Sequence, residues 1–336
     1  MGGITLHDVA AAASVSIFTA SKVLSGKDAT ARIKPETADR VRTAAQDLGY
    51  VTNHAARSLR TNKTSQIGIV LSEPGAWEAG MNPFDGALLV GLRMAALECD
   101  LPAIVLYPQG AGTDLAHYLD GRIDGLLVRC ALQSDEPLLH LVDPARLPVV
   151  ALWRQDVPDG FGYADIDHRG GAIQAVQHLM TLGHRRIVCF DPEGDNEDIH
   201  FGLRYQGYGD ALREAGIAPR PEWYVHDTAT LLALCQRHDP VTAAFAVSDT
   251  FAEQLAVDLI SAGVRIPADL SLVGFDDTAR TPVIAGGLTT VSHPMQDMTV
   301  QGVRNLSALI DGAACERCRS LVSTQLLVRN STAPPR

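Results

Sequence analysis

The sequence predicts an α/β protein in which a short N-terminal helical module precedes a larger body of doubly wound parallel sheets. Over the first fifty residues, apolar side chains recur at helical spacing between cap and turn residues. From Gln66 onward, short runs of consecutive apolar residues alternate with helical stretches. Buried strands that alternate with helices indicate a parallel sheet with helices on its faces.

The first two expected helices lie on either side of a tight break. Residues 6–10 carry one apolar face, residues 13–15 make the break, and Ser16 can cap a second helix over residues 17–24. Two short helices joined by a three- or four-residue turn form a helix-turn-helix, whose second helix enters the DNA major groove. Such pairs also occur as plain structural elements, so the neighbouring segments decide between the two interpretations.

Two further segments favour DNA binding. Pro35 opens a third helix, which Gly49 is expected to stop. A short helix is then expected over residues 53–60, where Leu59 is the one large apolar residue among basic side chains. An apolar side chain in a basic segment suits a minor-groove wedge that pries apart a base step.

The first sixty residues resemble the DNA-binding headpiece and hinge of the lactose-repressor (LacI/GalR) family of bacterial transcription regulators. The matching residues are Asp8, Val9, Ala10, Val15, Ser16, Thr19, Ser21, Lys22, Val23, Leu24, Leu48, Gly49, Tyr50, Asn53, Ala56, Arg57, Leu59 and Arg60. The resemblance implies a helix-turn-helix headpiece over 1–50 and a hinge helix and linker over 51–65. The DNA-binding residues that it implies are Thr5, Ser16, Ile17, Phe18, Thr19, Ser21, Lys22, Asn53, Ala56, Arg57 and Leu59.

The start of the expected recognition helix is unusual for a DNA-reading surface. Ile17 and Phe18 stand where base-reading side chains project, and they cannot hydrogen-bond to base edges, although they can contact thymine methyl groups. Either side chain could instead fold back onto the headpiece core. Ser14 occupies a turn position usually held by glycine in the family, where a positive φ would cost on the order of 1 kcal/mol.

The charge of the chain is unevenly distributed. Residues 1–65 contain nine Lys and Arg against five Asp and Glu, a net charge of +4, so the remainder carries −15 of the total of −11. A basic module can neutralise phosphates, whereas the acidic body is repelled from DNA.

Composition excludes several other classes. At 336 residues the chain should hold two or three domains. His7 and Asp8 interrupt the N-terminal segment, and no stretch approaches the ~20 apolar residues of a membrane helix, so a cytoplasmic protein is expected. Cys315 and Cys318 form a CxxC without a second ligand pair, which favours free thiols over zinc. Neither a metal nor a cofactor is expected.

Seven strands and four helices of the body can be named from the pattern. The strands are expected at 67–71, 103–107, 125–128, 148–152, 186–190, 243–247 and 270–275, and the helices at 84–98, 170–182, 205–215 and 250–262. Parallel sheets bind ligands at the carboxyl ends of their strands. The resulting ligand candidates are residues 73–77, Trp153, Arg154, residues 191–204, Ser248, Asp249, Asp276 and Asp277. His184 precedes a strand, which is the wrong end for chemistry, and is therefore interpreted as structural.

The LacI/GalR resemblance continues through the body. The matching residues are Asn82 to Phe84, Asp124, Gly125, Asp167, Gly183 to Ile187, Arg204, Gly207, Ile266, Pro267, Asp269, Val273 to Asp277, Leu288 to Val291, Val328, Arg329 and Ser331. The resemblance implies a two-lobed effector-binding and dimerisation body over 66–336, similar to periplasmic sugar-binding proteins. The chain would cross between the lobes near Ala164, Ser292 and Val322. The first lobe would then span about 66–164 and 293–322, and the second about 165–292 and 323–336.

The resemblance implies that Arg204 and Asp276 contact an effector. A planar guanidinium and a carboxylate can together grip vicinal hydroxyls, ring nitrogens or a carboxylate; a plain interlobe salt bridge is the alternative. Trp77 and Trp153 follow strands and can stack on a sugar ring or a nucleobase, or else pack under loops. The remaining expected effector-binding residues are Phe84 and Ser248. Because Trp153 and Ser248 replace polar family residues, the pocket could be more apolar than usual.

The sequence as a whole predicts a dimeric, ligand-responsive regulator, most simply a repressor, that binds operator DNA and a small-molecule effector such as a sugar. The dimer follows from the absence of a leucine heptad in residues 331–336. The rival interpretation is an enzyme on a doubly wound fold with structural N-terminal helices. The sequence lacks GxGxxG, GxxxxGK[ST] and GxSxG motifs, which argues against that rival.

Overall fold

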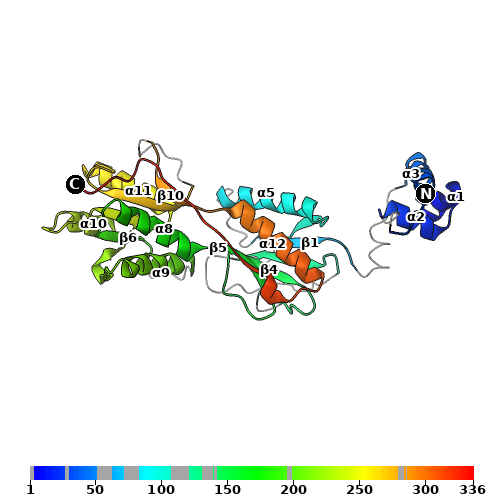
Figure 1. Ribbon diagram of the computed structural model, residues 1–336, viewed down its shortest axis with the longest axis horizontal. Helices are drawn as coiled ribbons and strands as arrows, with labels where there is room; N and C mark the ends of the chain where they lie inside the picture. The colour runs from blue at the N-terminus through cyan, green and yellow to red at the C-terminus, as the bar shows by residue number, and fades with distance from the viewer. Residues whose placement is uncertain are drawn as a thin grey trace. The chain divides into compact units, whose positions relative to one another are not determined.

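The computed structural model describes residues 4–26, 30–50, 63–71, 83–106, 121–130, 139, 142–194, 199–278, 284 and 286–336. The chain divides into two units, Met1–Thr64 and Ser65–Arg336 (Figure 1). Of the expected DNA-binding and effector-binding residues, Asn53, Ala56, Arg57, Leu59 and Trp77 lie outside the described residues, as do the ligand candidates 73–76 and 195–198. The expected hinge helix lies outside them as well.

The N-terminal unit contains the expected helix-turn-helix followed by a third helix. Its helices are α1 (Leu6–Ala12), α2 (Ile17–Leu24) and α3 (Pro35–Asp47). Val9, Val23 and Val41 meet in a small core, one from each helix. Ser14 adopts φ 55° in the turn, the strained conformation that the missing glycine suggested. The helix-turn-helix is confirmed.

The first sheet of the body has the order β11-β5-β4-β3-β1-β2. Its strands are β1 (Ile67–Leu71), β2 (Ala103–Leu106), β3 (Gly125–Arg129), β4 (Val149–Leu152), β5 (Gly162–Ile166) and β11 (Arg319–Val322), all parallel. Helices α5 (Pro83–Glu98) and α12 (Met295–Ile310) lie side by side on one face (Figure 1). Alternate residues of β1 point to opposite faces, so Ile69 packs with the helices and Val70 enters a separate cluster behind the sheet.

The second sheet has the order β12-β10-β9-β8-β6-β7. Its strands are β6 (Ile187–Phe190), β7 (Tyr224–Val225), β8 (Ala243–Ala246), β9 (Ser271–Asp276), β10 (Thr289–Ser292) and the antiparallel edge strand β12 (Leu326–Leu327). The helices of this part are α8 (His168–Thr181), α9 (Ile199–Glu214), α10 (Thr228–Cys235) and α11 (Asp249–Ser261). Setting aside β11 and β12, both sheets repeat one doubly wound order, which confirms the predicted fold class.

The chain passes between the two sheets three times. The passages are Asp167, His293 with Pro294, and residues 323–325. They lie beside one another, because the Asp167 amide donates to the Val322 carbonyl over 3.0 Å and the Ser292 amide donates to the Gln325 carbonyl over 2.8 Å. We call the first sheet with α5 and α12 the first lobe, and the second sheet with α8 to α11 the second lobe.

The predicted helix at 205–215 was wrong at its start. Helix α9 begins at Ile199, six residues earlier. In its first two turns, the side chains of His200 and Arg204 point toward the interior, and both are buried. Because those inward residues are polar, the segment lacks the apolar periodicity on which the prediction depended.

Candidate functional site: a DNA-reading helix and an interlobe effector site

Helix α2 presents two large apolar side chains to solvent. Ile17 is 48% exposed and Phe18 is 67% exposed, so neither is folded onto the headpiece core. The ammonium group of Lys22 lies 5.3 Å from the centroid of the Phe18 ring. A cation over the face of an exposed aromatic ring can contact a phosphate while the ring meets the apolar part of a base.

Two of the expected DNA-binding residues also cap helices. The Thr5 hydroxyl accepts from the Asp8 amide at the start of α1, and the Asp8 carboxylate accepts from the Thr5 amide. The Ser16 hydroxyl accepts from the Thr19 amide at the start of α2. Both caps are exposed. The first turn of α2 contains no acidic residue, so its positive end is open to a phosphate group.

Arg204 and Asp276 form a buried ion pair at the carboxyl edge of the second sheet. The Arg204 Nη2 atom lies 2.9 Å from Asp276 Oδ1, and the two side chains are 2% and 9% exposed. The guanidinium also donates to the Val247 carbonyl and lies 3.8 Å from the centroid of the Phe275 ring. Both members of the pair belong to the second lobe, so they form a salt bridge within one lobe and not between the lobes.

Trp153 follows β4 at the carboxyl edge of the first sheet and is packed inside the protein. It is 5% exposed and adopts φ 63°. Its ring centroid lies 5.2 Å from that of Phe84 and 5.5 Å from that of His200, with the His200 ring nearly parallel. This packing fits the alternative in which the indole fills space. Its Nε1 atom has no hydrogen-bond partner among the described residues, a group that an effector could engage.

Ser248 caps α11 through its hydroxyl, which accepts from the Phe251 amide over 3.3 Å. Its neighbour Asp249 is fully buried and accepts from the Thr290 hydroxyl and the Thr278 amide. These bonds fix the carboxyl ends of β8 and β9 relative to each other. Ser248 is 6% exposed and its hydroxyl is engaged in capping α11. Its position therefore presents the start of a helix to the site.

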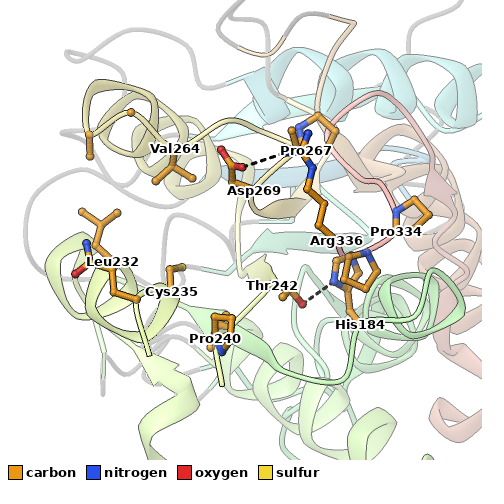
Figure 2. A pocket seen from close by; sticks show the side chains of 16 residues that line it. His184, Leu232, Cys235, Pro240, Thr242, Val264, Pro267, Asp269, Pro334 and Arg336 are labelled. Atoms are coloured by element: carbon orange, nitrogen blue, oxygen red, sulfur yellow. Dashed lines mark hydrogen bonds and ion pairs between the residues drawn. The ribbon is translucent and has the colours of Figure 1, made fainter. Parts of the chain in front are cut away.

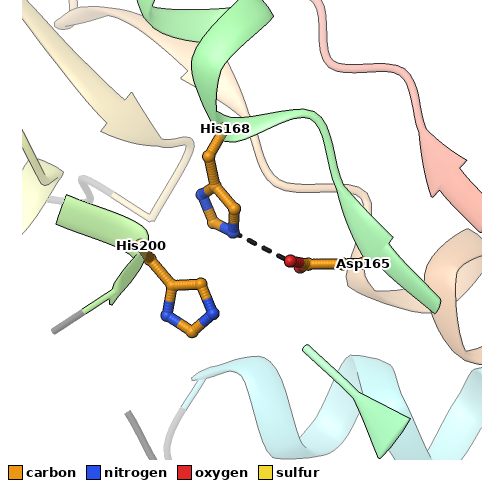
Figure 3. Close-up of side chains that lie close together, drawn as sticks. All are labelled: Asp165, His168 and His200. Atoms are coloured by element: carbon orange, nitrogen blue, oxygen red, sulfur yellow. Dashed lines mark ion pairs between the residues drawn. The ribbon is translucent and has the colours of Figure 1, made fainter. Parts of the chain in front are cut away.

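Three histidines fill the space between the lobes. His168 opens α8, His200 lies in the first turn of α9, and His293 lies in the second passage between the sheets. Figure 3 shows His168 and His200 beside Asp165 of β5. The centroids of the His168 ring and the His200 ring are 4.6 Å apart, and those of His168 and His293 are 6.0 Å apart. His200 falls within the predicted ligand range 191–204, whereas the sequence did not point to His168, His293 or Asp165.

The hydrogen bonds define the protonation of two of these rings. Arg204 Nε donates to His168 Nδ1 over 3.2 Å, so the proton of a neutral His168 lies on Nε2, which faces Asp165 Oδ1 at 3.3 Å. His200 Nε2 lies 3.0 Å from the Trp153 carbonyl oxygen. A carbonyl can only accept, so this nitrogen carries the proton of His200. The His200 bond joins the second lobe to the first.

Burial opposes charge throughout this cluster. It lowers the pKa of His168 and of His293 well below the ordinary value of 6.5, and neighbouring cationic groups lower both further. Burial also raises the pKa of Asp165 above 3.8, although His200 and the Ile166 amide act in the opposite direction. Both histidines are therefore neutral near pH 7.

Asp165, His168 and His200 have ligand atoms within 4.8 Å of one another, a spacing that would suit a metal ion. The hydrogen bonds argue against this use. His168 offers its bare nitrogen to Arg204 and points a protonated nitrogen at Asp165. A metal requires a bare imidazole nitrogen, so the tautomer that the Arg204 hydrogen bond imposes on His168 argues against a metal ion here.

We expect the stability of the protein to fall in mild acid because of these histidines. A histidine with a lower pKa in the folded chain binds fewer protons than in the unfolded chain. Its contribution is therefore complete above pH about 6.5 and decreases below that value, by at most about 1.4 kcal/mol per pH unit per group. Urea unfolding of wild type and His293→Asn between pH about 7.5 and 5 measures it. The raised pKa of Asp165 makes the protein more stable as the pH falls, but it does so equally in both proteins. If the unfolding free energies of the two proteins depended equally on pH, the assignment of His293 would be contradicted.

The second lobe has a further pocket at the opposite end of its sheet (Figure 2). It has a volume of about 370 Å³ and is lined in part by His184, Thr242 and the C-terminal residues 334–336. His184 lies 2.8 Å from the Thr242 hydroxyl and 2.9 Å from the Ala333 carbonyl, and its pKa is lowered by burial. These bonds hold the chain end against the amino ends of the strands, as expected for a structural residue.

Comparisons with known proteins agree with this architecture. Residues 5–53 match the family described as bacterial regulatory proteins, lacI family, and residues 176–332 match the periplasmic binding protein-like domain. The chain is 34% identical to the HTH-type transcriptional regulator CelR of Thermobifida fusca, over 97% of this chain and 98% of that protein. It is 27% identical to the HTH-type transcriptional repressor PurR of Aliivibrio salmonicida, again over 97% and 98%.

Solved structures show the same fold. A complex of the transcriptional regulator CelR with cellobiose superposes with a TM-score of 0.67 at 30% identity, covering 98% of this chain and 99% of that one. The lac repressor dimer bound to operator and an anti-inducer superposes with a TM-score of 0.71 at 22% identity, covering 99% and 100%. Among the described residues, none of the helices is long and apolar enough to span a membrane.

Proposed function

Because the chain belongs to the lacI family of bacterial regulatory proteins, we propose that it is a dimeric repressor whose operator affinity changes when a small molecule binds between the lobes. The main support is that one chain contains both an exposed recognition helix, α2, and a buried ion pair, Arg204 with Asp276, at the carboxyl edge of the second sheet. It would act in the cytoplasm, where the DNA is, and without catalysis. The relatives that support this are transcription regulators.

The charges around the site favour an uncharged, hydroxyl-rich effector. Arg204 is neutralised by Asp276, and Arg129 lies 3.5 Å from the Asp85 carboxylate. A charged effector would have to break one of these buried pairs, whereas hydroxyls can both donate to and accept from them. The CelR–cellobiose complex makes a disaccharide the first compound to test.

The effector would act by shifting a population of lobe arrangements. The lobes are joined by three adjacent passages and by the bond between His200 and the Trp153 carbonyl. A ligand changes their arrangement only to the extent that it binds one arrangement better than another. We propose that this change is passed to the segment that joins the headpiece to the body.

Two measurements test this function. Selection of genomic fragments that bind the full chain should recover a pseudo-palindromic operator. A thermal-shift screen of cellobiose, other sugars, nucleosides and small acids should yield a ligand that raises the melting temperature, since it binds only the folded protein. Failure to recover any specific DNA sequence would overturn the proposal.

Leu59→Ala is expected to weaken operator binding and reduce DNA bending while leaving effector affinity unchanged. Leu59 is the large apolar residue of a basic segment, and an inserted apolar wedge is what kinks a minor groove. A circular-permutation gel compares the bend angles of wild type and variant, with Leu59→Ile as the control that keeps the apolar volume. Equal bending by wild type and Leu59→Ala would show that Leu59 does not act as a minor-groove wedge.

Helix α5 offers the surface for the dimer. Val90, Met94 and Leu97 are 49%, 46% and 70% exposed and recur at i, i+4 and i+7, which places them on one face. A self-complementary apolar stripe is typical of a twofold interface.

Leu97→Asp should therefore shift the protein toward monomers, because it places a charge on that stripe. Leu97→Met should leave the assembly as it is. Sedimentation at micromolar concentration checks both variants. A stable dimer in Leu97→Asp would exclude this stripe from the interface, and a stable wild-type tetramer would contradict the dimer itself.

A further inference from the structure

We propose that His168 is a positioning residue of the effector site, which holds the Arg204 guanidinium in the orientation that pairs it with Asp276. The proposal rests on the proposed function, because it assigns Arg204 to effector binding. It extends the site to two residues, His168 and Asp165, that lie outside the set predicted from the sequence.

The orientation of Arg204 is determined by three partners, one for each nitrogen. Nε donates to His168 Nδ1, Nη1 donates to the Val247 carbonyl, and Nη2 pairs with Asp276 Oδ1. A guanidinium is planar, so fixing its Nε end as well as its two terminal nitrogens removes the remaining rotation about the side chain. His168 supplies the Nε partner.

His168 can accept from Arg204 only in one neutral tautomer, with its proton on Nε2. Asp165 Oδ1 lies 3.3 Å from His168 Nε2, a close contact rather than a hydrogen bond, and accepts from the Ile166 amide over 2.8 Å. Burial and the nearby Arg204 charge lower the pKa of His168, which keeps the ring neutral. A charged ring would point an N–H at the Arg204 Nε–H, and the two donors would repel each other.

This chain of contacts crosses the junction between the lobes. Asp165 ends the first lobe in β5, Asp167 is the passage, and His168 begins the second lobe in α8 (Figure 3). A change in lobe arrangement therefore moves the support of His168 relative to Arg204. The same geometry that positions the effector-binding guanidinium makes its orientation depend on lobe arrangement.

The matched variants are His168→Asn and His168→Leu in the full chain. The Asn Oδ1 atom stands close to where His Nδ1 stands and can accept from Arg204, whereas Leu fills similar space without an acceptor. The first readout needs no effector. ¹⁵N NMR, with Arg204→Lys used for assignment, follows the Arg204 Nε–H and the His168 ring nitrogens.

The wild type should show His168 as the Nε2–H tautomer without titration between pH about 6 and 8. Its Arg204 Nε–H should exchange slowly with water. The slow exchange should be lost in His168→Leu and retained in His168→Asn. A wild-type His168 protonated on Nδ1, or an unchanged Arg204 signal in His168→Leu, would overturn the proposal. If His168→Leu does not fold, the wild-type tautomer and the Asn variant still decide.

The second readout is calorimetric binding of cellobiose. His168→Leu should raise the dissociation constant about tenfold or more, and His168→Asn by much less, because only Leu leaves Arg204 without its Nε acceptor. In an Arg204→Lys background the two substitutions should have equal effects, since the coupling runs through the guanidinium. Equal losses in both variants with Arg204 present would count against positioning. If cellobiose does not bind the wild type, cellobiose is excluded as the effector, whereas the NMR result still decides the role of His168.

Discussion

Arg204→Ala is expected to give a regulator that binds its operator but no longer responds to effector. The substitution removes the donor to Val247, to His168 and to the Asp276 carboxylate at once. Breaking a buried ion pair by removing one partner costs about 3–5 kcal/mol. The variant should therefore also unfold at a clearly lower temperature. An operator titration with and without saturating effector measures the response.

Two controls separate the site from a general loss of stability. Asp276→Asn keeps an acceptor for Arg204 and should lose less stability than Arg204→Ala. Arg265→Ala breaks an exposed pair with Asp269, 63% and 35% exposed, where solvent screening leaves little net energy. It should melt and respond as wild type does. If Arg204→Ala and Asp276→Ala both kept the wild-type effector midpoint, the assignment of these residues to the effector site would be wrong.

Removal of the headpiece is the second large effect. A chain of residues 66–336 should lose specific operator binding by about a thousandfold or more, since specific binding exceeds non-specific binding by at least that factor. Salt-dependent, non-specific DNA binding should be lost as well, because the headpiece and linker carry +4 and the body −15. Fluorescence anisotropy at several salt concentrations measures both. Effector binding by residues 66–336 provides the control for folding.

Smaller changes within α2 refine this prediction. Lys22→Ala should cost about 1–3 kcal/mol if Lys22 contacts a base, or reduce the salt dependence by about one phosphate contact. If Phe18 contacts a thymine methyl, replacing that thymine by uracil should weaken wild type about fourfold, since one buried methyl is worth about 0.8 kcal/mol. Phe18→Ala should then be insensitive to the replacement. Operator binding by residues 66–336 that equals the full chain would refute the whole assignment.

The elements that the sequence predicted correctly are those whose physical signal is local. Strand β1 is an uninterrupted apolar run, and Thr5 and Ser16 cap helices through their own hydroxyls. Strand β5 was not predicted, because Gly162 begins it and Asp165 interrupts its apolar character. Its stability comes from pairing with β4 and β11. These contacts are long-range in sequence, so the local pattern of apolar residues does not reveal them.

The site was predictable only in part for the same reason. Arg204 and Asp276 could be named from the family resemblance and because both follow strands along the chain, and the structure brings them together. The roles of His168, Asp165 and His293 depend on which side chains meet between two lobes that are joined by three passages. A histidine beside a family aspartate at the end of a buried strand is the one signal that could have pointed to His168.

The most direct test of the central claim is an operator titration of the full chain, with and without the ligand that raises its melting temperature most. Saturating ligand should change the operator midpoint by about tenfold or more, a coupling free energy of at least about 1.4 kcal/mol. By reciprocity, operator should change the ligand affinity by the same factor. An unchanged operator midpoint, with calorimetry showing the ligand bound, would contradict the claim that this site regulates DNA binding.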